Sequence, residues 1–262
     1  MKFKYHNVLL PNGRWTVPGA IPLKRTETFA AIANYLYVKY PHWQQRKDIT
    51  LLDVGSLEGG YAVLFTQMGF KVTMIEARQN NIKKSCEMAS LMGMDIEMLA
   101  GDAKEILKQS RKWDVVVCAG VLYHLNKPVD FFDLLNSCSI NDLIVSTHYS
   151  LFDDERYELP AIVKRIRRMI YKRIPGLFNK AEHNLSSLDL NEGFEGRWAK
   201  EYPEKAKKGE IEESALAAYS NHKSFWLTLQ SLARLGSLAK QRHIKLRQDR
   251  IHHSICFVCS NG

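Results

Sequence analysis

A short apolar segment that runs into a glycine turn constrains this chain most. The segment Leu51–Gly59 carries Asp53, Gly55 and Gly59, and the next apolar segment ends in Glu76. Strand, glycine turn, helix, second strand and terminal acid, in this order, are typical of an adenosine-binding site in a doubly wound α/β sheet. We therefore expect Gly55 to let cofactor atoms approach the backbone and Glu76 to accept hydrogen bonds from ribose hydroxyls.

The spacing of this turn argues against a dinucleotide. A nicotinamide fingerprint reads G-x-G-x-x-G and places a helix N-terminus against a pyrophosphate. Here the pattern is D-x-G-x-x-x-G, and Leu57 lies two residues after Gly55, where it would crowd a pyrophosphate. The turn instead resembles motif I of the class I S-adenosylmethionine-dependent methyltransferases, whose cofactor has no phosphate.

Two later motifs strengthen this resemblance. Ala100-Gly101-Asp102-Ala103 follows a third apolar segment, and the β-branched run Val115–Val117 predicts a strand buried on both faces. The run Gly120–Leu125 reads GVLYHL and is followed by Pro128. This is similar to the G-x-L-Y-H-L-x-x-P signature of one bacterial subgroup of these methyltransferases, which also carries an N-x-x-S-F-W segment and whose substrate is unassigned.

The resemblance implies an enzyme that uses S-adenosyl-L-methionine. It assigns Asp102 to the exocyclic amine of adenine. For Glu58 two roles stay open, a contact with the amino group of the cofactor or a first-turn acid that the helix dipole favours. The expected cofactor-binding residues are Asp53, Gly55, Glu58, Gly59, Glu76, Asp102, Ala103, Gly120 and Leu122.

The order of segments predicts the fold. Five strand-like segments at 49–54, 71–76, 96–100, 113–118 and 143–147 alternate with helical ones, and two more strands at 244–246 and 254–260 close the chain. We expect an α/β, Rossmann-like, doubly wound and mostly parallel seven-stranded sheet with an antiparallel last strand. Residues 1–262 form one domain in this interpretation, with an N-terminal cap (1–48), a cofactor-binding core (49–150), a helical, substrate-covering insertion between strands five and six (151–223), and a final helix and strands (224–262).

Composition sets limits. The chain has 262 residues, of which 45% are hydrophobic, and a formal net charge of +9. It has no run of 18 apolar residues and no apolar N-terminal leader, and the spacing of its cysteines suits a reducing compartment, so we expect a cytoplasmic protein. Cys256 and Cys259 lie in a strand-like run and are expected to be buried rather than to hold a metal, so no metal site is predicted.

Residues 161–180 combine apolar residues at helical spacing with seven Lys and Arg and no acid. Such a helix can lie on an anionic membrane or on nucleic acid, or it can pack as a lid with its charges in solvent. The lid is the favoured interpretation, and peripheral membrane contact and RNA binding stay open.

Methyl transfer to a hydroxyl benefits from a general base, and a histidine suits that task. His148 and His124 each follow a strand at its carboxyl end, where open α/β sheets bind ligands. His148 is the first choice, while His252 and His253 are expected at the surface. The candidates for binding substrate are Tyr123, Arg197, Trp198, Asn221, His222 and Trp226.

The sequence thus predicts a methyltransferase that acts on an oxygen or nitrogen of a small-molecule or carbohydrate intermediate, through histidine-assisted in-line displacement. A tRNA-modifying enzyme is the first alternative, because the same signature occurs in wobble-uridine enzymes. Those enzymes use a cofactor with an extra carboxylate, and the sequence does not reveal the cationic contacts for it. A nicotinamide-linked oxidoreductase and a non-catalytic cofactor-binding scaffold are further alternatives. The sequence does not fix the acceptor or the oligomeric state.

Overall fold

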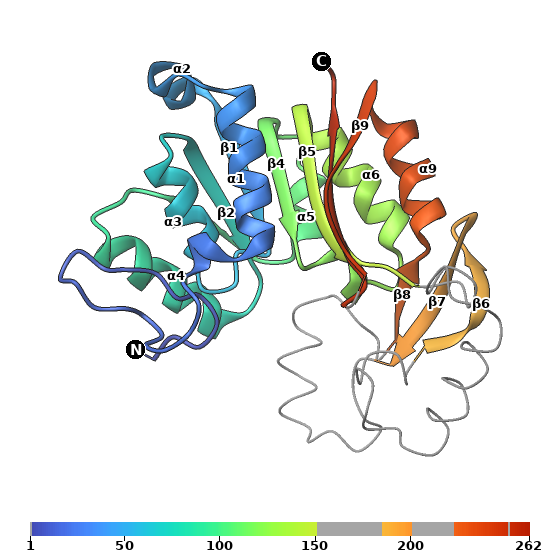
Figure 1. The fold of residues 1–262 in the computed structure, drawn as a ribbon, viewed down its shortest axis with the longest axis horizontal. Coiled ribbons are helices and arrows are strands. Elements are labelled where there is room, and N and C mark those ends of the chain that lie inside the picture. The colour runs from blue at the N-terminus through green and yellow to red at the C-terminus, as the bar shows by residue number, and fades with distance from the viewer. Residues whose placement is uncertain (1, 151–184, 201–222, 251) are drawn as a thin grey trace.

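The computed structural model describes residues 2–150, 185–200, 223–250 and 252–262 (Figure 1). Its main feature is one seven-stranded sheet in the order β3-β2-β1-β4-β5-β10-β9. Neighbouring strands from β3 to β5 are parallel, whereas β10 is antiparallel to both β5 and β9. This confirms the predicted mostly parallel sheet with an antiparallel last strand. The strands are β3 (Glu97–Ala100), β2 (Lys71–Glu76), β1 (Thr50–Val54), β4 (Trp113–Ala119), β5 (Ser139–His148), β10 (Ser254–Ser260) and β9 (Arg242–Asp249).

Helices cover both faces of this sheet (Figure 1). Leu51 and Val115 pack into one core, while their neighbours Leu52 and Val116 pack into the other, because successive strand residues point to opposite faces. The first core is covered by α1 (Glu27–Lys39), α3 (Gly60–Gln67) and α4 (Gln79–Leu91), and the second by α5 (Ala103–Leu107), α6 (Pro128–Cys138) and α9 (Leu229–Ala239). Shorter helices are η1 (Leu23–Arg25), α2 (Trp43–Asp48) and η2 (Leu122–His124).

The insertion differs from its prediction. Its described part is a second, antiparallel sheet of β6 (Leu185–Asn191), β7 (Phe194–Lys200) and β8 (Lys223–Leu227), not a set of helices. Gly196 explains part of this difference, because a Cβ there would lie 2.5 Å from a ring carbon of Phe225, so only glycine allows β7 and β8 to pair this closely. Likewise β9 extends over Arg242–Asp249, beyond the short strand expected at 244–246. The predicted basic helix at 161–180 lies outside the described residues.

The turn between β6 and β7 docks the second sheet on the first. The carboxylate of Glu192 accepts hydrogen bonds from the backbone N–H groups of Val129 (3.0 Å) and Asp130 (2.9 Å), in the first turn of α6. From strand β8 of this sheet, the backbone carbonyl of Leu227 accepts from the backbone N–H of Ser150 at 2.9 Å. Residues far apart in sequence are thereby held beside the carboxyl ends of β4 and β5.

In the part of the chain that the structure describes, no helix has the length and apolar character needed to cross a membrane.

Candidate active site

The glycine turn after β1 is shaped by tight packing. Gly55 has φ of +74°, and a Cβ there would lie 2.4 Å from Cγ2 of Val121. Gly59 has φ of +78° and precedes the first residue of α3. Leu57 also adopts a positive φ, +54°, which is uncommon for a branched residue. The loop therefore holds a fixed path along the carboxyl end of β1.

Glu76 ends β2 and faces this turn. Its Oε2 accepts from the backbone N–H of Leu57 at 2.9 Å, and its Oε1 accepts from Ala77 (3.0 Å) and Arg78 (2.9 Å). A carboxylate has about four lone-pair positions, so roughly one remains for a ligand hydroxyl. The side chain is buried, which keeps it in this orientation.

Asp53 lies behind the turn, fully buried in β1. Burial, reinforced by the charge of Glu76, raises the pKa of Asp53 to about 7, against the lowering effect of a hydrogen bond from the Ala62 backbone N–H. Its Oδ2 has no hydrogen-bond partner. A buried, unpartnered carboxylate oxygen at this place could accept from a cationic group of a ligand.

Glu58 does not face a ligand, so its expected contact with the cofactor is wrong. Its carboxylate accepts from the backbone N–H groups of Lys4, Tyr5 and His6 and pairs with Lys84 Nζ at 2.8 Å. Although burial alone would favour the neutral acid, these contacts hold the pKa of Glu58 below its ordinary value. Glu58 therefore anchors the N-terminal segment on the turn.

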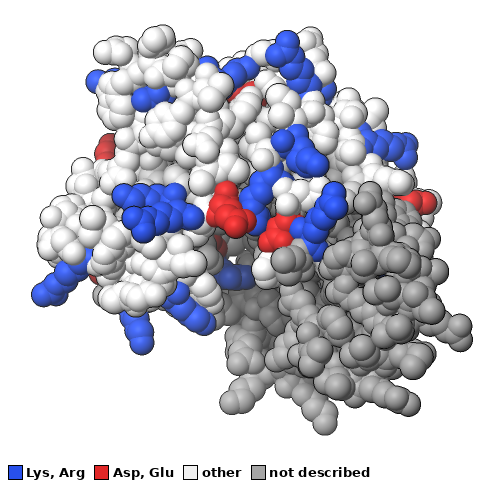
Figure 2. All heavy atoms as spheres, viewed as in Figure 1, with Lys and Arg blue, Asp and Glu red and all other residues white. Residues whose placement is uncertain are grey.

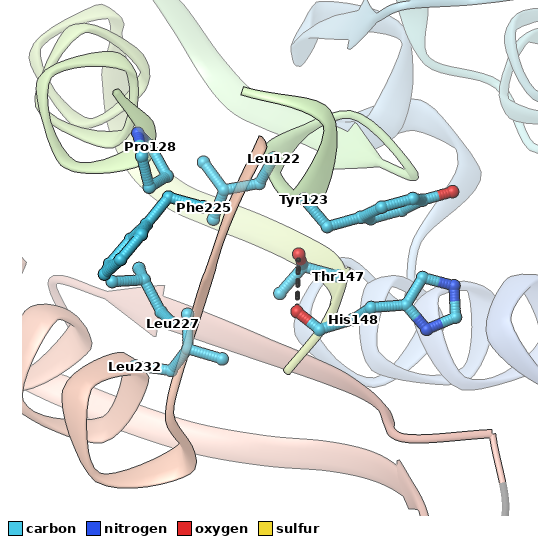
Figure 3. A pocket seen from close by; sticks show the side chains of 8 residues that line it. All are labelled: Leu122, Tyr123, Pro128, Thr147, His148, Phe225, Leu227 and Leu232. Atoms are coloured by element: carbon cyan, nitrogen blue, oxygen red, sulfur yellow. Dashed lines mark hydrogen bonds between the residues drawn. The ribbon is translucent and has the colours of Figure 1, made fainter. Parts of the chain in front are cut away.

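The other predicted cofactor residues lie along the same sheet edge. Asp102 accepts from the Lys104 backbone N–H through Oδ1 (2.9 Å), which caps α5, and the following Ala103 is buried. Gly120 has φ of +83° and open space at its Cβ position. Leu122 is a core residue, and its side chain helps to line the small hollow of Figure 3. Elsewhere only its backbone could contact a ligand.

Four rings gather at the carboxyl ends of β4 and β5. Tyr123 meets His148 edge-on with ring centroids 4.4 Å apart, and it lies 4.1 Å from the ring of His124. On its other side His148 stacks on Trp226 of β8, at 5.2 Å and an interplanar angle of 14°. The second sheet thus supplies one wall around His148.

His148 is oriented by the last hairpin of the chain. Its Nδ1 lies 3.0 Å from the backbone carbonyl of His252, and because a carbonyl only accepts, Nδ1 carries the proton and Nε2 the lone pair of the neutral ring. Burial lowers the pKa of His148, and the carbonyls of His252 and His253 only partly oppose this. His148 is therefore neutral at pH 7 and can accept a proton at Nε2. No sequence pattern predicts this role of His252, and His253, expected at the surface, is buried.

Tyr123 and His148 project in the same direction, away from Phe225 and Leu227 (Figure 3). The four are among the eight residues around a narrow hollow that has no room for a water molecule in this structure. The hollow is therefore a gap in the packing beside His148, not a formed ligand pocket.

The predicted substrate residues separate into two faces of the second sheet. Arg197 pairs with Trp226 across β7 and β8, and Trp198 pairs with Phe225 on the opposite face. Trp198 packs edge-on against Phe225 at 4.9 Å and donates from Nε1 to Asp189, and its contact with the substrate stays a prediction. Asn221 and His222 lie outside the described residues.

A protein-family model described as "Methyltransferase domain" matches residues 27–192, more than half of the chain. Among curated proteins, the "Ubiquinone biosynthesis O-methyltransferase" of Rickettsia bellii (strain OSU 85-389) is 32% identical over 99 residues, which are 37% of this chain and 41% of that protein. The "tRNA U34 carboxymethyltransferase" of Campylobacter lari is 23% identical over 164 residues, 60% of this chain and 54% of that protein. The chain thus spans about two fifths of the length of the first of these relatives.

Solved structures share the fold. The N-terminal domain of EvdMO1 with SAH bound has a TM-score of 0.61 at 19% identity, covering 90% of this chain and 82% of that one. Magnesium protoporphyrin IX methyltransferase (ChlM) from Synechocystis PCC 6803, also with bound SAH, has a TM-score of 0.53 at 12% identity, covering 94% of this chain and 90% of that one. At these identities the likeness concerns the fold alone.

Proposed function

Because this chain belongs to the family of methyltransferase domains, we propose that it transfers the methyl group of S-adenosyl-L-methionine to an oxygen or nitrogen of a small-molecule or carbohydrate acceptor. The name of the Rickettsia relative supports an oxygen acceptor. The SAH bound in two structures of the same fold supports the cofactor. Family membership also speaks against the alternative of a nicotinamide-linked oxidoreductase.

The residues along the sheet edge fit this cofactor. Glu76 has about one lone pair left for a ribose hydroxyl, and we assign Asp102, whose Oδ1 caps α5, to the adenine amine. The unpartnered Oδ2 of Asp53 suits a cationic amino group. When bound, S-adenosyl-L-methionine supplies a methyl group that its sulfonium already activates. The protein's own work is then to align the acceptor, exclude water and remove a proton.

The observation that carries the acceptor chemistry is the orientation of His148. Its Nδ1–H is held by the His252 carbonyl, and burial keeps the ring neutral, so Nε2 is available as a base. We assign the proton acceptance to His148, whose ring the His252 carbonyl orients, and His124 is the second candidate. Tyr123 and Trp226 both pack against the His148 ring, which restricts its rotation.

Calorimetric titration with S-adenosylhomocysteine, and with NADH in parallel, tests the proposal. Micromolar binding of S-adenosylhomocysteine and none of NADH is the expected result. Glu76→Ala should weaken this binding at least tenfold, because it removes a buried charge-assisted hydrogen bond worth about 1.5–3 kcal/mol. Absence of binding by the unmodified protein, or NADH binding alone, would overturn the proposed function.

A tRNA acceptor is the second candidate, supported by the Campylobacter lari relative and by the net charge of +9. Figure 2 shows Lys and Arg scattered over one face of the molecule rather than gathered in one stripe. Salt-sensitive binding distinguishes this candidate, since each neutralised phosphate of a single strand adds about −0.7 to the slope of log K against log salt. Weak binding of tRNA at low salt would exclude a tRNA acceptor.

A further inference from the structure

Two buried donors on one face of the second sheet have no hydrogen-bond partner among the residues that the structure describes. They are Nε of Arg197 on β7 and Nε1 of Trp226 on β8. The two residues are directly opposite each other in the β7–β8 ladder, and such pairs project from the same face with Cβ atoms about 5 Å apart. Trp226 is only 7% exposed, so its indole N–H does not hydrogen-bond to solvent in place of a protein partner.

This donor pair lies beside the proposed base. The indole of Trp226 stacks on His148 at 5.2 Å and meets Tyr123 edge-on at 5.8 Å. Arg197 is fixed from its other side, because its Nη1 donates to the carbonyl of Ser186 at 2.9 Å. Among the described residues no carboxylate pairs with Arg197.

Both unpartnered groups can only donate, and one belongs to a permanent cation. A neutral hydroxyl would leave this charge uncompensated, whereas a carboxylate accepts from a guanidinium edge and from a second N–H at once. We infer that Arg197 and Trp226 form a carboxylate-binding site beside His148. This inference rests on the proposed function. If both hold, the acceptor is an acid whose carboxylate lies close to the methylated atom, such as a sugar acid or a hydroxylated aromatic acid.

The indole proton of Trp226 reports directly on this site. The chain has five tryptophans, so a spectrum of protein with ¹⁵N-labelled tryptophan is simple, and Trp226→Phe assigns the resonance while keeping an aromatic ring on His148. Protein saturated with S-adenosylhomocysteine is titrated with galacturonate and, separately, with 3,4-dihydroxybenzoate. Galactose and catechol are the matched probes without a carboxylate.

A saturable downfield shift of the Trp226 proton with at least one acid, and none with its neutral partner, is the expected result. Arg197→Met should weaken that binding at least tenfold and leave S-adenosylhomocysteine binding unchanged. Arg14→Met, at an exposed arginine, is the matched control and should change neither. No shift with either acid or with carboxy-S-adenosylmethionine, or an equal shift with acid and neutral probe, would overturn the inference.

The carboxylate could also belong to a carboxylated cofactor. Titration of the ligand-free protein with carboxy-S-adenosylmethionine and with S-adenosylmethionine distinguishes this source. A Trp226 shift with the carboxylated form alone, and with neither acid, supports the carboxylate site and assigns it to the cofactor. Failure of the proposed function has a different signature, because then S-adenosylhomocysteine itself does not bind.

Discussion

Glu58 and His6 hold each other in place across the start of helix α3. Glu58 Oε2 accepts from the backbone N–H of His6 at 3.1 Å, and Nδ1 of His6 accepts from the backbone N–H of Gly60 at 2.9 Å. The N–H of Gly60, at the start of the helix, has no hydrogen-bond acceptor within the helix, and His6 supplies one. The two bonds together fix the N-terminal segment against the glycine turn. The cofactor turn is thus supported from outside the sheet.

Glu58→Ala should destabilise the protein by about 3–5 kcal/mol, because it leaves the largely buried Lys84 ammonium without its carboxylate. Urea unfolding monitored by circular dichroism measures this. Glu105→Ala removes one side of an exposed pair with Lys108 and should leave the unfolding midpoint unchanged. An unaltered midpoint in Glu58→Ala, combined with weaker S-adenosylhomocysteine binding, would restore the cofactor role of Glu58.

The protein should lose stability between pH 6.5 and about pH 4 through His6. Burial lowers the pKa of His6 from 6.5 to about 4, so in this window the unfolded chain binds more protons than the folded one. The free energy of unfolding therefore falls as pH falls, by about 2 kcal/mol from pH 7 to pH 5 at roughly 1.4 kcal/mol per pKa unit. Urea unfolding at the two pH values checks this. His6→Asn keeps an acceptor for the Gly60 N–H but does not titrate. In this variant the free energy of unfolding should therefore fall by about 2 kcal/mol less between pH 7 and pH 5. Parallel losses in both proteins would contradict the prediction.

Gly55→Ala should be more harmful than Gly13→Ala, although both positions have similar positive φ, +74° and +80°. The Gly13 site is open, so only about 1 kcal/mol of backbone strain is expected there. At Gly55 the new methyl group meets Val121, which adds about 1–3 kcal/mol and displaces the turn. Thermal unfolding and S-adenosylhomocysteine titration measure both effects. Val121→Ala in the same chain should recover part of the loss, and no recovery would place the strain elsewhere.

His148→Ala should lower the turnover rate about 10²-fold or more and spare cofactor affinity, because only proton removal is lost. The rate of the unmodified protein should fall on the acid side through a pKa below 6.5, since burial lowers the pKa of His148 and the protonated ring cannot act as a base. Methyl transfer from labelled S-adenosyl-L-methionine, measured from pH 5 to 8, tests both. His124→Ala is the matched comparison and should retain the acid limb. Full activity in His148→Ala would exclude this base.

Local sequence determined the cofactor half of the protein. The strands and helices of residues 49–148 follow from apolar periodicity, glycine turns and terminal acids, because each of these signals lies within the element itself or at its end. Gly55 and Glu76 could be predicted for the same reason. Glu58 could not, because its partners, the backbone amides of the N-terminal segment, are more than 50 residues away in sequence and carry no side-chain signal.

Only the tertiary structure decided which residues surround His148. Trp226 reaches it, with Arg197 opposite Trp226 in the ladder, because β8 pairs with β7 and the β6–β7 turn docks on α6, and these are non-local contacts of a small antiparallel sheet. The same pairing turns Trp198 to the opposite face, since side chains alternate along a strand. A sequence pattern shows which aromatic and basic residues lie near one another along the chain. The register of strand pairing then decides which of them share a face of the sheet.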